Sequence, residues 1–116
     1  LVMAVGGAGA EATMWGIAQP IMNVLDFGMD PQTALNAPRF RYGDIYHYTG
    51  GTQTDIPATI NAEVYAELAA MGHELSDHGT FRNPSRGTTN MIVVAPGTGV
   101  LMGGAAPAGR DFVSGY

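Results

Sequence analysis

A glycine-rich stretch near the start of the chain is the part of the sequence best suited to chemistry. Residues 7–12 fit the pattern G-x-G-x-x-A, follow an apolar run and precede a helical pattern. Dinucleotide-binding proteins hold a pyrophosphate with such a turn, but they also need a buried parallel strand after the helix, where this chain has another turn. Backbone N–H groups at a strand-to-helix turn can instead stabilise an oxyanion in acyl transfer. A structural interpretation is that the glycines only let strand and helix pack closely.

The remaining side chains suggest neither a metal site nor a cofactor site. The chain has no cysteine, and the spacing of His47, His73 and His78 matches no strong ligand motif, so we expect no metal and no cofactor. Arg39 follows a proline, and its guanidinium carries five donors that could tie loop carbonyls or a carboxylate together. We expect Arg39 to be a structural anchor.

The elements that must position the glycine turn can be predicted from apolar periodicity. Leu1 to Val5 is typical of a buried strand that ends at the glycines. A helix should follow, with a kink or break near Pro20 and a stop at Gly28. Its expected apolar stripe recurs at helical spacing and consists of Met14, Ile17, Ala18, Ile21, Met22 and Leu25.

The rest of the chain alternates between short helices and strands. Asp30 and Pro31 predict a capped helix through Ala37, and residues 39–48 look extended. A loop then leads to a helix over residues 59–71, with Val64, Leu68 and Met71 on one face and Gly72 after its end. Residues 78–90 look irregular, and strands are expected over residues 73–77, 91–95 and 100–103, the last two joined by a hairpin turn.

These elements predict a mixed α/β (α+β) fold with too few strands to cover both faces of a sheet. We therefore expect part of the layer to come from sequence outside this chain, which has no initiator methionine. Alone, such a chain should aggregate, self-associate or bind its missing half, because its apolar faces and strand edges would be uncovered.

Composition excludes several classes of partner. Ten acidic residues against five arginines give a formal charge of -5, which disfavours nucleic acid as a partner. The apolar stretches are far shorter than the roughly 20 residues of a membrane helix, so no membrane is expected either. No positive residue precedes Arg39, so no secretory signal is visible. Localisation stays open between periplasmic or extracellular and cytoplasmic.

Two blocks of sequence, Ala4–Glu11 and Gln19–Phe40, resemble the gamma-glutamyltransferase family. The part from Asn23 to Phe40 is long, contiguous and unusual. Later parts of the family are resembled by Leu68–Leu75, Gly99–Ala105 and the final Gly115–Tyr116. The resemblance implies a single partial domain over residues 1–116, the C-terminal part of a small subunit. It also implies the αββα four-layer sandwich of the N-terminal nucleophile hydrolases.

The resemblance also implies a role for the glycine turn. Counting back from Gln19 without a gap puts the family's two oxyanion glycines at Gly9 and Ala10, whose backbone N–H groups would be the donors; a slip in alignment would select Gly6 and Gly7. The chain departs from the family pattern at Ala10, at Ala8, where the family has proline, and at Ala106–Ala108, where it has Asp-Pro-Arg.

The function implied is that of a threonine hydrolase that cleaves γ-glutamyl amides such as glutathione through an acyl-enzyme and undergoes autoproteolysis. The threonine nucleophile and the residues that grip the substrate lie upstream in the family, so this chain alone would lack the nucleophile. Its partners would be the large subunit, the N-terminal part of the small subunit and a small γ-glutamyl substrate. Two alternatives stay open: a related acylase of the cephalosporin acylase type, or a non-catalytic interaction module.

Overall fold

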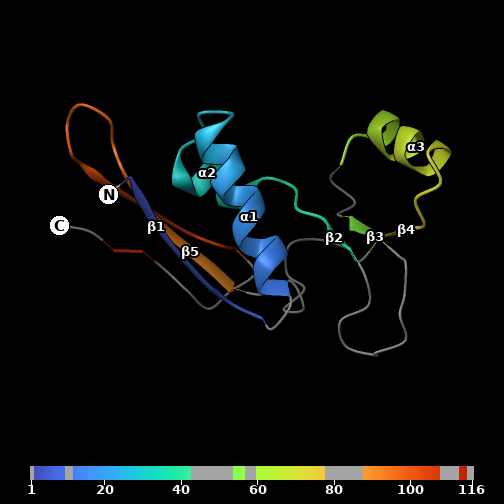
Figure 1. The fold of residues 1–116 in the computed structure, drawn as a ribbon, viewed down its shortest axis with the longest axis horizontal. Helices are drawn as coiled ribbons and strands as arrows, with labels where there is room; N and C mark the ends of the chain where they lie inside the picture. The colour runs from blue at the N-terminus through green and yellow to red at the C-terminus, as the bar shows by residue number, and fades with distance from the viewer. Residues whose placement is uncertain are drawn as a thin grey trace.

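Two small sheets and three helices make up the part of the chain that the computed structural model describes, which comprises residues 2–9, 12–42, 54–56, 60–77, 88–107 and 113–114 (Figure 1). The first sheet is antiparallel and has the order β1-β5-β6, with bounds Met3–Ala8, Thr88–Val94 and Leu101–Ala105. The second sheet has the order β2-β3-β4, with bounds Arg41–Tyr42, Thr54–Ile56 and Leu75–Asp77. In it β2 and β3 are antiparallel, whereas β3 and β4 are parallel.

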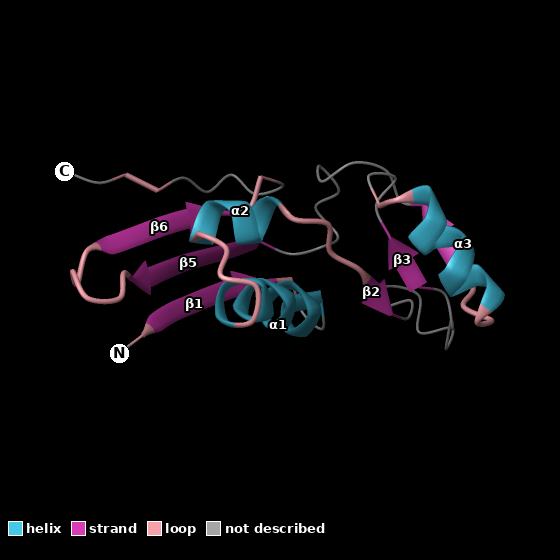
Figure 2. Ribbon diagram, turned by 90° about the horizontal axis from the view of Figure 1, so that it is seen from above, coloured by secondary structure: helices cyan, strands magenta, loops and turns pink. Residues whose placement is uncertain are grey.

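Helices α1 (Ala12–Leu25) and α2 (Pro31–Asn36) cover one face of the first sheet (Figure 2). Side chains alternate between the two faces of each strand, so every second residue of β5 meets the helices. Leu35 of α2 packs there with Met91 and Val93 to form the buried core. Hydrophobic side chains packed around this core are Met3, Val5, Ile21, Val24 and Met102.

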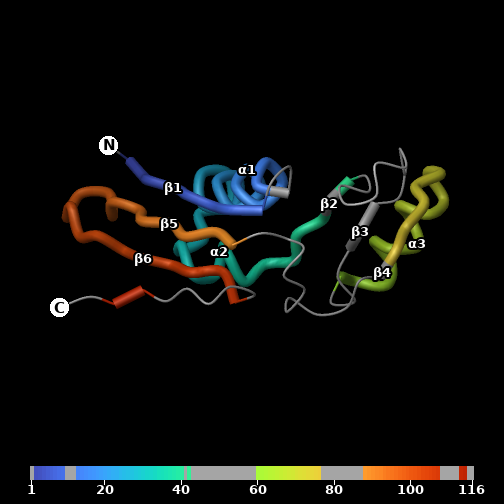
Figure 3. Tube along the Cα trace, turned by 90° about the horizontal axis from the view of Figure 1, so that it is seen from below, coloured from blue at the N-terminus to red at the C-terminus, as the bar shows by residue number. Residues whose placement is uncertain are grey.

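Among the described residues, no helix packs on the opposite face of the first sheet. Ile92 and its cross-strand partners Ala4 and Gly103 lie there, and Ile92 is 47% exposed. Residues 113–114 run beside β6 (Figure 3), and Val113 lies over Gly103, where a Cβ on the glycine would collide with the valine side chain. The first sheet thus has α1 and α2 on a single side.

The face that α1 buries differs from the predicted stripe. Gly16 and Pro20 are buried and Ile17, Ile21 and Val24 are half-buried, whereas Met14, Met22 and Leu25 of the expected stripe are exposed. The helix has apolar residues around most of its circumference, so periodicity alone could not decide which side faces the sheet. The helix also continues through Pro20, so it does not break there.

The first strand is longer than predicted, because Gly6 and Gly7 continue it to Ala8 and the turn begins only at Gly9. It is also less buried, because one of its faces is exposed. Strand β3 was not expected, since it lies in a stretch interpreted as a loop, and β5 begins at Thr88, inside the stretch expected to be irregular. Residues 43–48, part of the predicted extended segment, lie outside the described residues.

Three local predictions are confirmed. Helix α2 begins at Pro31 behind the N-cap Asp30 and ends with Ala37 as its C-cap. Residues 95–100 connect β5 and β6 as the expected hairpin. Helix α3 (Ala62–Ala70) is followed by Gly72 with a φ of 93°, which favours glycine.

The predicted apolar face of α3 is not buried. Val64 and Met71 are exposed, and Leu68 is only half-buried. Among the described helices, none combines the length and apolar character needed to cross a membrane.

Candidate functional site

The turn between β1 and α1 is the candidate site. Gly9 follows β1 directly and has a φ of 145°, a conformation in which side-chain-bearing residues are strained. Ala10 and Glu11, which come next in the chain, lie outside the described residues. Gly6 and Gly7, the alternative pair, lie within β1 opposite Asn90 and Thr89 rather than in the turn.

The strand leading into the turn lies very close to its neighbour. A Cβ atom on Gly7 would be 2.7 Å from the carbonyl oxygen of Thr88 and 3.4 Å from the Ile17 side chain. A contact of 2.7 Å to backbone cannot be relieved by moving a flexible side chain, so Gly7 is needed for this approach. Gly6 has no such neighbours, because its Cβ position is open on the other face of the sheet.

The strand arrangement does not fit the dinucleotide-binding interpretation. Such a unit requires a parallel strand beside β1 after the helix. Within the described residues, the strand paired with β1 is β5, which is antiparallel and comes much later in the chain. Helix α1 is instead followed by a turn and α2.

Arg39 reaches back to α1 from the segment that follows α2. It is only 4% exposed, and its Nη1 donates to the carbonyl of Gly16 over 3.5 Å. That carbonyl lies four residues before Pro20, and proline has no N–H with which to complete the helical hydrogen bond. The guanidinium therefore meets an acceptor that the helix itself leaves open.

Gln19, one turn further along α1, holds the same segment by its side-chain amide. Its Nε2 donates to the carbonyl of Phe40 over 2.8 Å, and its Oε1 accepts from the Phe40 N–H over 2.9 Å. The Phe40 ring lies 5.8 Å from that of Trp15, centroid to centroid. Arg39 and Phe40 are thus fixed against the helix that follows the glycine turn.

Gln32 of α2 makes an equivalent amide contact with β6, the edge strand of the first sheet. Its Nε2 donates to the Ala105 carbonyl over 2.9 Å and its Oε1 accepts from the Ala105 N–H over 3.1 Å. Gly104 allows this contact, because a Cβ there would lie 2.7 Å from the backbone of Pro31. No contact was predicted from the sequence for either glutamine, although both lie in the block from Gln19 to Phe40 that resembles the family.

Asp30 caps α2 with both carboxylate oxygens. Oδ1 accepts from the N–H groups of Gln32 and Thr33, each over 3.0 Å, and Oδ2 accepts from the Thr33 hydroxyl over 2.5 Å. These hydrogen bonds, that of the Thr33 side chain first, lower the pKa of Asp30 below its usual value. Since a lowered folded pKa stabilises the ionised form, this contribution is present above the unfolded pKa and is lost as pH falls through the folded pKa.

Substitution of Asp30 tests whether its ionised carboxylate stabilises the folded protein. We expect Asp30→Ala to lower the free energy of unfolding by about 1 kcal/mol at neutral pH, the usual cost of an N-cap. Asp30→Asn keeps the acceptor and should lose less. Both differences from the unsubstituted protein should shrink when unfolding in urea is measured below about pH 4. A pH-independent difference for Asp30→Asn would contradict the role of the ionised carboxylate.

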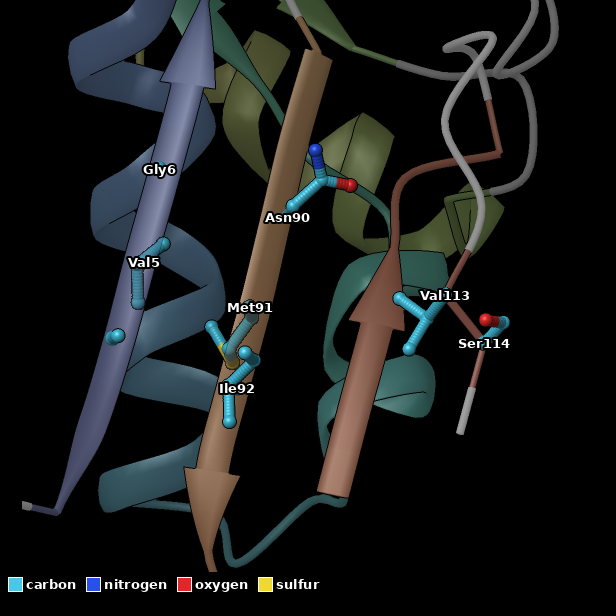
Figure 4. A pocket seen from close by; sticks show the side chains of 8 residues that line it. Val5, Gly6, Asn90, Met91, Ile92, Val113 and Ser114 are labelled. Atoms are coloured by element: carbon cyan, nitrogen blue, oxygen red, sulfur yellow. The ribbon is translucent and has the colours of Figure 1, made fainter. Parts of the chain in front are cut away.

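The uncovered face of the first sheet contains a groove of about 560 Å³ (Figure 4). Its lining residues are Ala4, Val5, Gly6, Asn90, Met91, Ile92, Val113 and Ser114. The set is mostly apolar and contains no titratable side chain, so none of its side chains could act as a general acid or base. Across the described residues, no three acidic or histidine side chains gather closely enough to hold a metal ion.

Comparison with known proteins gave one family and several structures. The sequence model described as gamma-glutamyltranspeptidase matches residues 1–116. A gamma-glutamyltranspeptidase of Helicobacter pylori superposes with a TM-score of 0.74 at 27% identity, over 93% of this chain and 54% of that one. A cephalosporin acylase of Bacillus halodurans gives 0.74 at 31% identity, over 90% and 18%.

A gamma-glutamyltranspeptidase of Pseudomonas nitroreducens gives a TM-score of 0.76 at 24% identity, over 99% and 55%, a likeness that concerns the fold. The fold is therefore that of the N-terminal nucleophile hydrolases, as the resemblance implied. The chain spans about half the length of the transpeptidase chains it matches. No curated protein sequence matches it.

Proposed function

The chain belongs to the gamma-glutamyltranspeptidase family, and from that premise we propose that it forms part of a threonine hydrolase that cleaves γ-glutamyl amides such as glutathione. In this proposal residues 1–116 are one partial domain of the small subunit. The remainder of the small subunit and a large subunit supply the threonine nucleophile and the groups that grip the substrate. Self-cleavage of a precursor would expose that threonine.

The observation that carries the proposal is the position of Gly9. It begins the turn that joins a strand to a helix, in a chain matched by the family over its whole length. In our assignment the N–H groups of Gly9 and Ala10 donate to the oxyanion, with Gly6 and Gly7 as the alternative pair. Because alanine keeps its backbone N–H, Ala10 can serve as well as the family's glycine provided its φ is negative.

The proposed reaction proceeds in two steps. The threonine hydroxyl attacks the γ-carbonyl carbon, its proton passes to the enzyme's own α-amino group, and the carbonyl oxygen becomes the oxyanion held by the turn. The C–N bond then breaks, and the leaving amine takes the proton. Attack by water or an amino acid on the ester carbonyl repeats the sequence and releases the γ-glutamyl group. Every bond formed is matched by one broken and no atom changes oxidation state, so the steps require no redox cofactor.

Hydrolysis of a γ-glutamyl anilide by the natively processed protein tests the function. The expected result is release of the aniline. The slow phase of this release, in which the acyl-enzyme is cleaved, should become faster when an amino acid acceptor is added. Lack of turnover by an intact, processed two-subunit sample would overturn the proposal and leave the related acylase and the non-catalytic module.

A related acylase is the second candidate, favoured by the 31% identity to the Bacillus halodurans cephalosporin acylase. Both share the oxyanion chemistry and differ in the acyl group that the upstream residues grip. Hydrolysis of a cephalosporin side-chain amide with a higher kcat/KM than that of the γ-glutamyl anilide would select this candidate.

The uncovered face of the first sheet is where we place the rest of the enzyme. In the four-layer fold, another sheet from the rest of the enzyme would stack on this face. Ile92 lies near the middle of the face and is exposed and apolar. We expect Ile92→Asp in the full-length protein to prevent assembly and processing, because a buried carboxylate without a partner is strongly unfavourable.

The matched control is Val100→Asp in the hairpin, at an exposed β-branched residue. Processing is followed by gel electrophoresis of the two subunits. Normal processing of Ile92→Asp would show that this face stays in water.

A further inference from the structure

Helix α1 has an internal acceptor that must find donors from elsewhere in the chain. Pro20 cannot donate to the Gly16 carbonyl, and both residues are buried, so water does not replace the missing donor. Two side chains meet this carbonyl: the Thr89 hydroxyl donates over 3.2 Å and Arg39 Nη1 over 3.5 Å. The shorter contact comes from β5, which is 73 residues away in sequence.

Thr89 also lies beside the strand on the other side of the glycine turn. In the antiparallel pairing of β1 with β5, Thr89 is opposite Gly7. Gly7 lies two residues before Gly9. The Thr89 carbonyl accepts from the Ala106 N–H over 2.8 Å, and the Thr89 side chain is 1% exposed. One buried residue therefore contacts both the strand before the turn and the helix after it.

We propose that Thr89 is a positioning residue for the β1–α1 turn, setting the place of its backbone donors by fixing α1 to β5 at Gly16. This inference rests on the proposed function, in which those donors hold the oxyanion. Such donors must be kept within roughly 0.5 Å of the productive geometry, so a helix free to shift against the sheet would misplace them. Pro20 contributes by leaving the Gly16 carbonyl open to a donor from outside the helix.

Three variants of the full-length protein test the proposal. Thr89→Val keeps the branched shape and removes the donor, whereas Thr89→Ser keeps the hydroxyl. We expect Thr89→Val to lower kcat for a γ-glutamyl anilide by about tenfold or more with KM little changed, and Thr89→Ser to restore most of it. Hydrogen exchange, followed by mass spectrometry, should accelerate over residues 7–16 in Thr89→Val and not in Thr89→Ser.

The double variant Pro20→Ala with Thr89→Val distinguishes two roles for Thr89. Its hydroxyl either positions α1 against β5 or only supplies a hydrogen bond to the buried Gly16 carbonyl. Alanine at position 20 restores the helical N–H donor to Gly16 but not the link to β5. We expect kcat to stay low in the double variant even where thermal stability recovers. Recovery of kcat would overturn the proposal, because the hydroxyl would then only satisfy a buried acceptor.

The remaining outcomes are also decisive. Unchanged kcat and unchanged exchange in Thr89→Val would overturn the proposal, as would equal losses in Thr89→Val and Thr89→Ser, which would indicate packing. If Thr89→Val does not fold, Pro20→Ala alone still decides, because its helical N–H competes with Thr89 for the Gly16 carbonyl. Exchange over residues 7–16 should then accelerate in Pro20→Ala, and unchanged exchange would overturn the proposal. No turnover by the unsubstituted protein would overturn the proposed function, whereas exchange would still report whether Thr89 holds the turn.

Discussion

Replacing Gly9 by valine should lower kcat for γ-glutamyl anilide hydrolysis by about 10²-fold to 10³-fold, with a much smaller change in KM. The φ of 145° at Gly9 lies where a branched side chain is strongly strained, so valine must change the backbone of the turn. The N–H groups proposed to hold the oxyanion would then point elsewhere. Loss of one oxyanion donor typically costs this factor in kcat, because the charge it stabilises develops only in the transition state.

The matched control for Gly9→Val is Gly99→Val. Gly99 also has a positive φ, 72°, and lies in the β5–β6 hairpin with open space around its Cβ position. Both substitutions should strain the backbone, so both should lower thermal stability. Only Gly9→Val should reduce kcat strongly. Equal kcat in the two variants would show that the turn has no role in catalysis. The proposed function would then lose its main support.

Local features of the sequence predicted local features of the fold. Asp30 and Pro31 start α2, and the Pro-Gly-Thr-Gly turn joins β5 to β6, because caps and tight turns are specified by neighbouring residues. The buried side of α1 was not predictable in this way. Apolar residues lie on nearly all sides of α1. Contacts with β1 and β5 determine which side is buried, and apolar periodicity carries no information about those contacts.

The surroundings of the turn were predictable only in part. The burial of Arg39 against α1 fits the expectation of an anchor, a role that stays a proposal. The partners of Thr89 and Gln32 lie 73 residues away, and no spacing rule relates positions at that distance. One signal was present for Gly16: a proline within a helical pattern leaves a carbonyl open, so a donor from elsewhere could have been sought.

The largest effect on stability should come from Leu35→Ala. Leu35 is 0% exposed and packs with Met91 and Val93 between α2 and the first sheet. Removing its side chain loses buried apolar surface and leaves a cavity that α2 cannot close, because Gln32 and the close approach at Gly104 fix the helix to β6. We expect a loss of about 2–5 kcal/mol in the free energy of unfolding.

Leu25→Ala is the matched control, since Leu25 lies at the end of α1 and is 59% exposed. The same chemical change there should cost no more than about 0.5 kcal/mol, because little apolar surface is uncovered and no cavity forms. Denaturant unfolding of the full-length protein measures both. A cost at Leu25 equal to that at Leu35 would mean that the outer side of α1 is also buried in the assembled enzyme. The core would then extend beyond the face described here, through contacts made by the remainder of the enzyme.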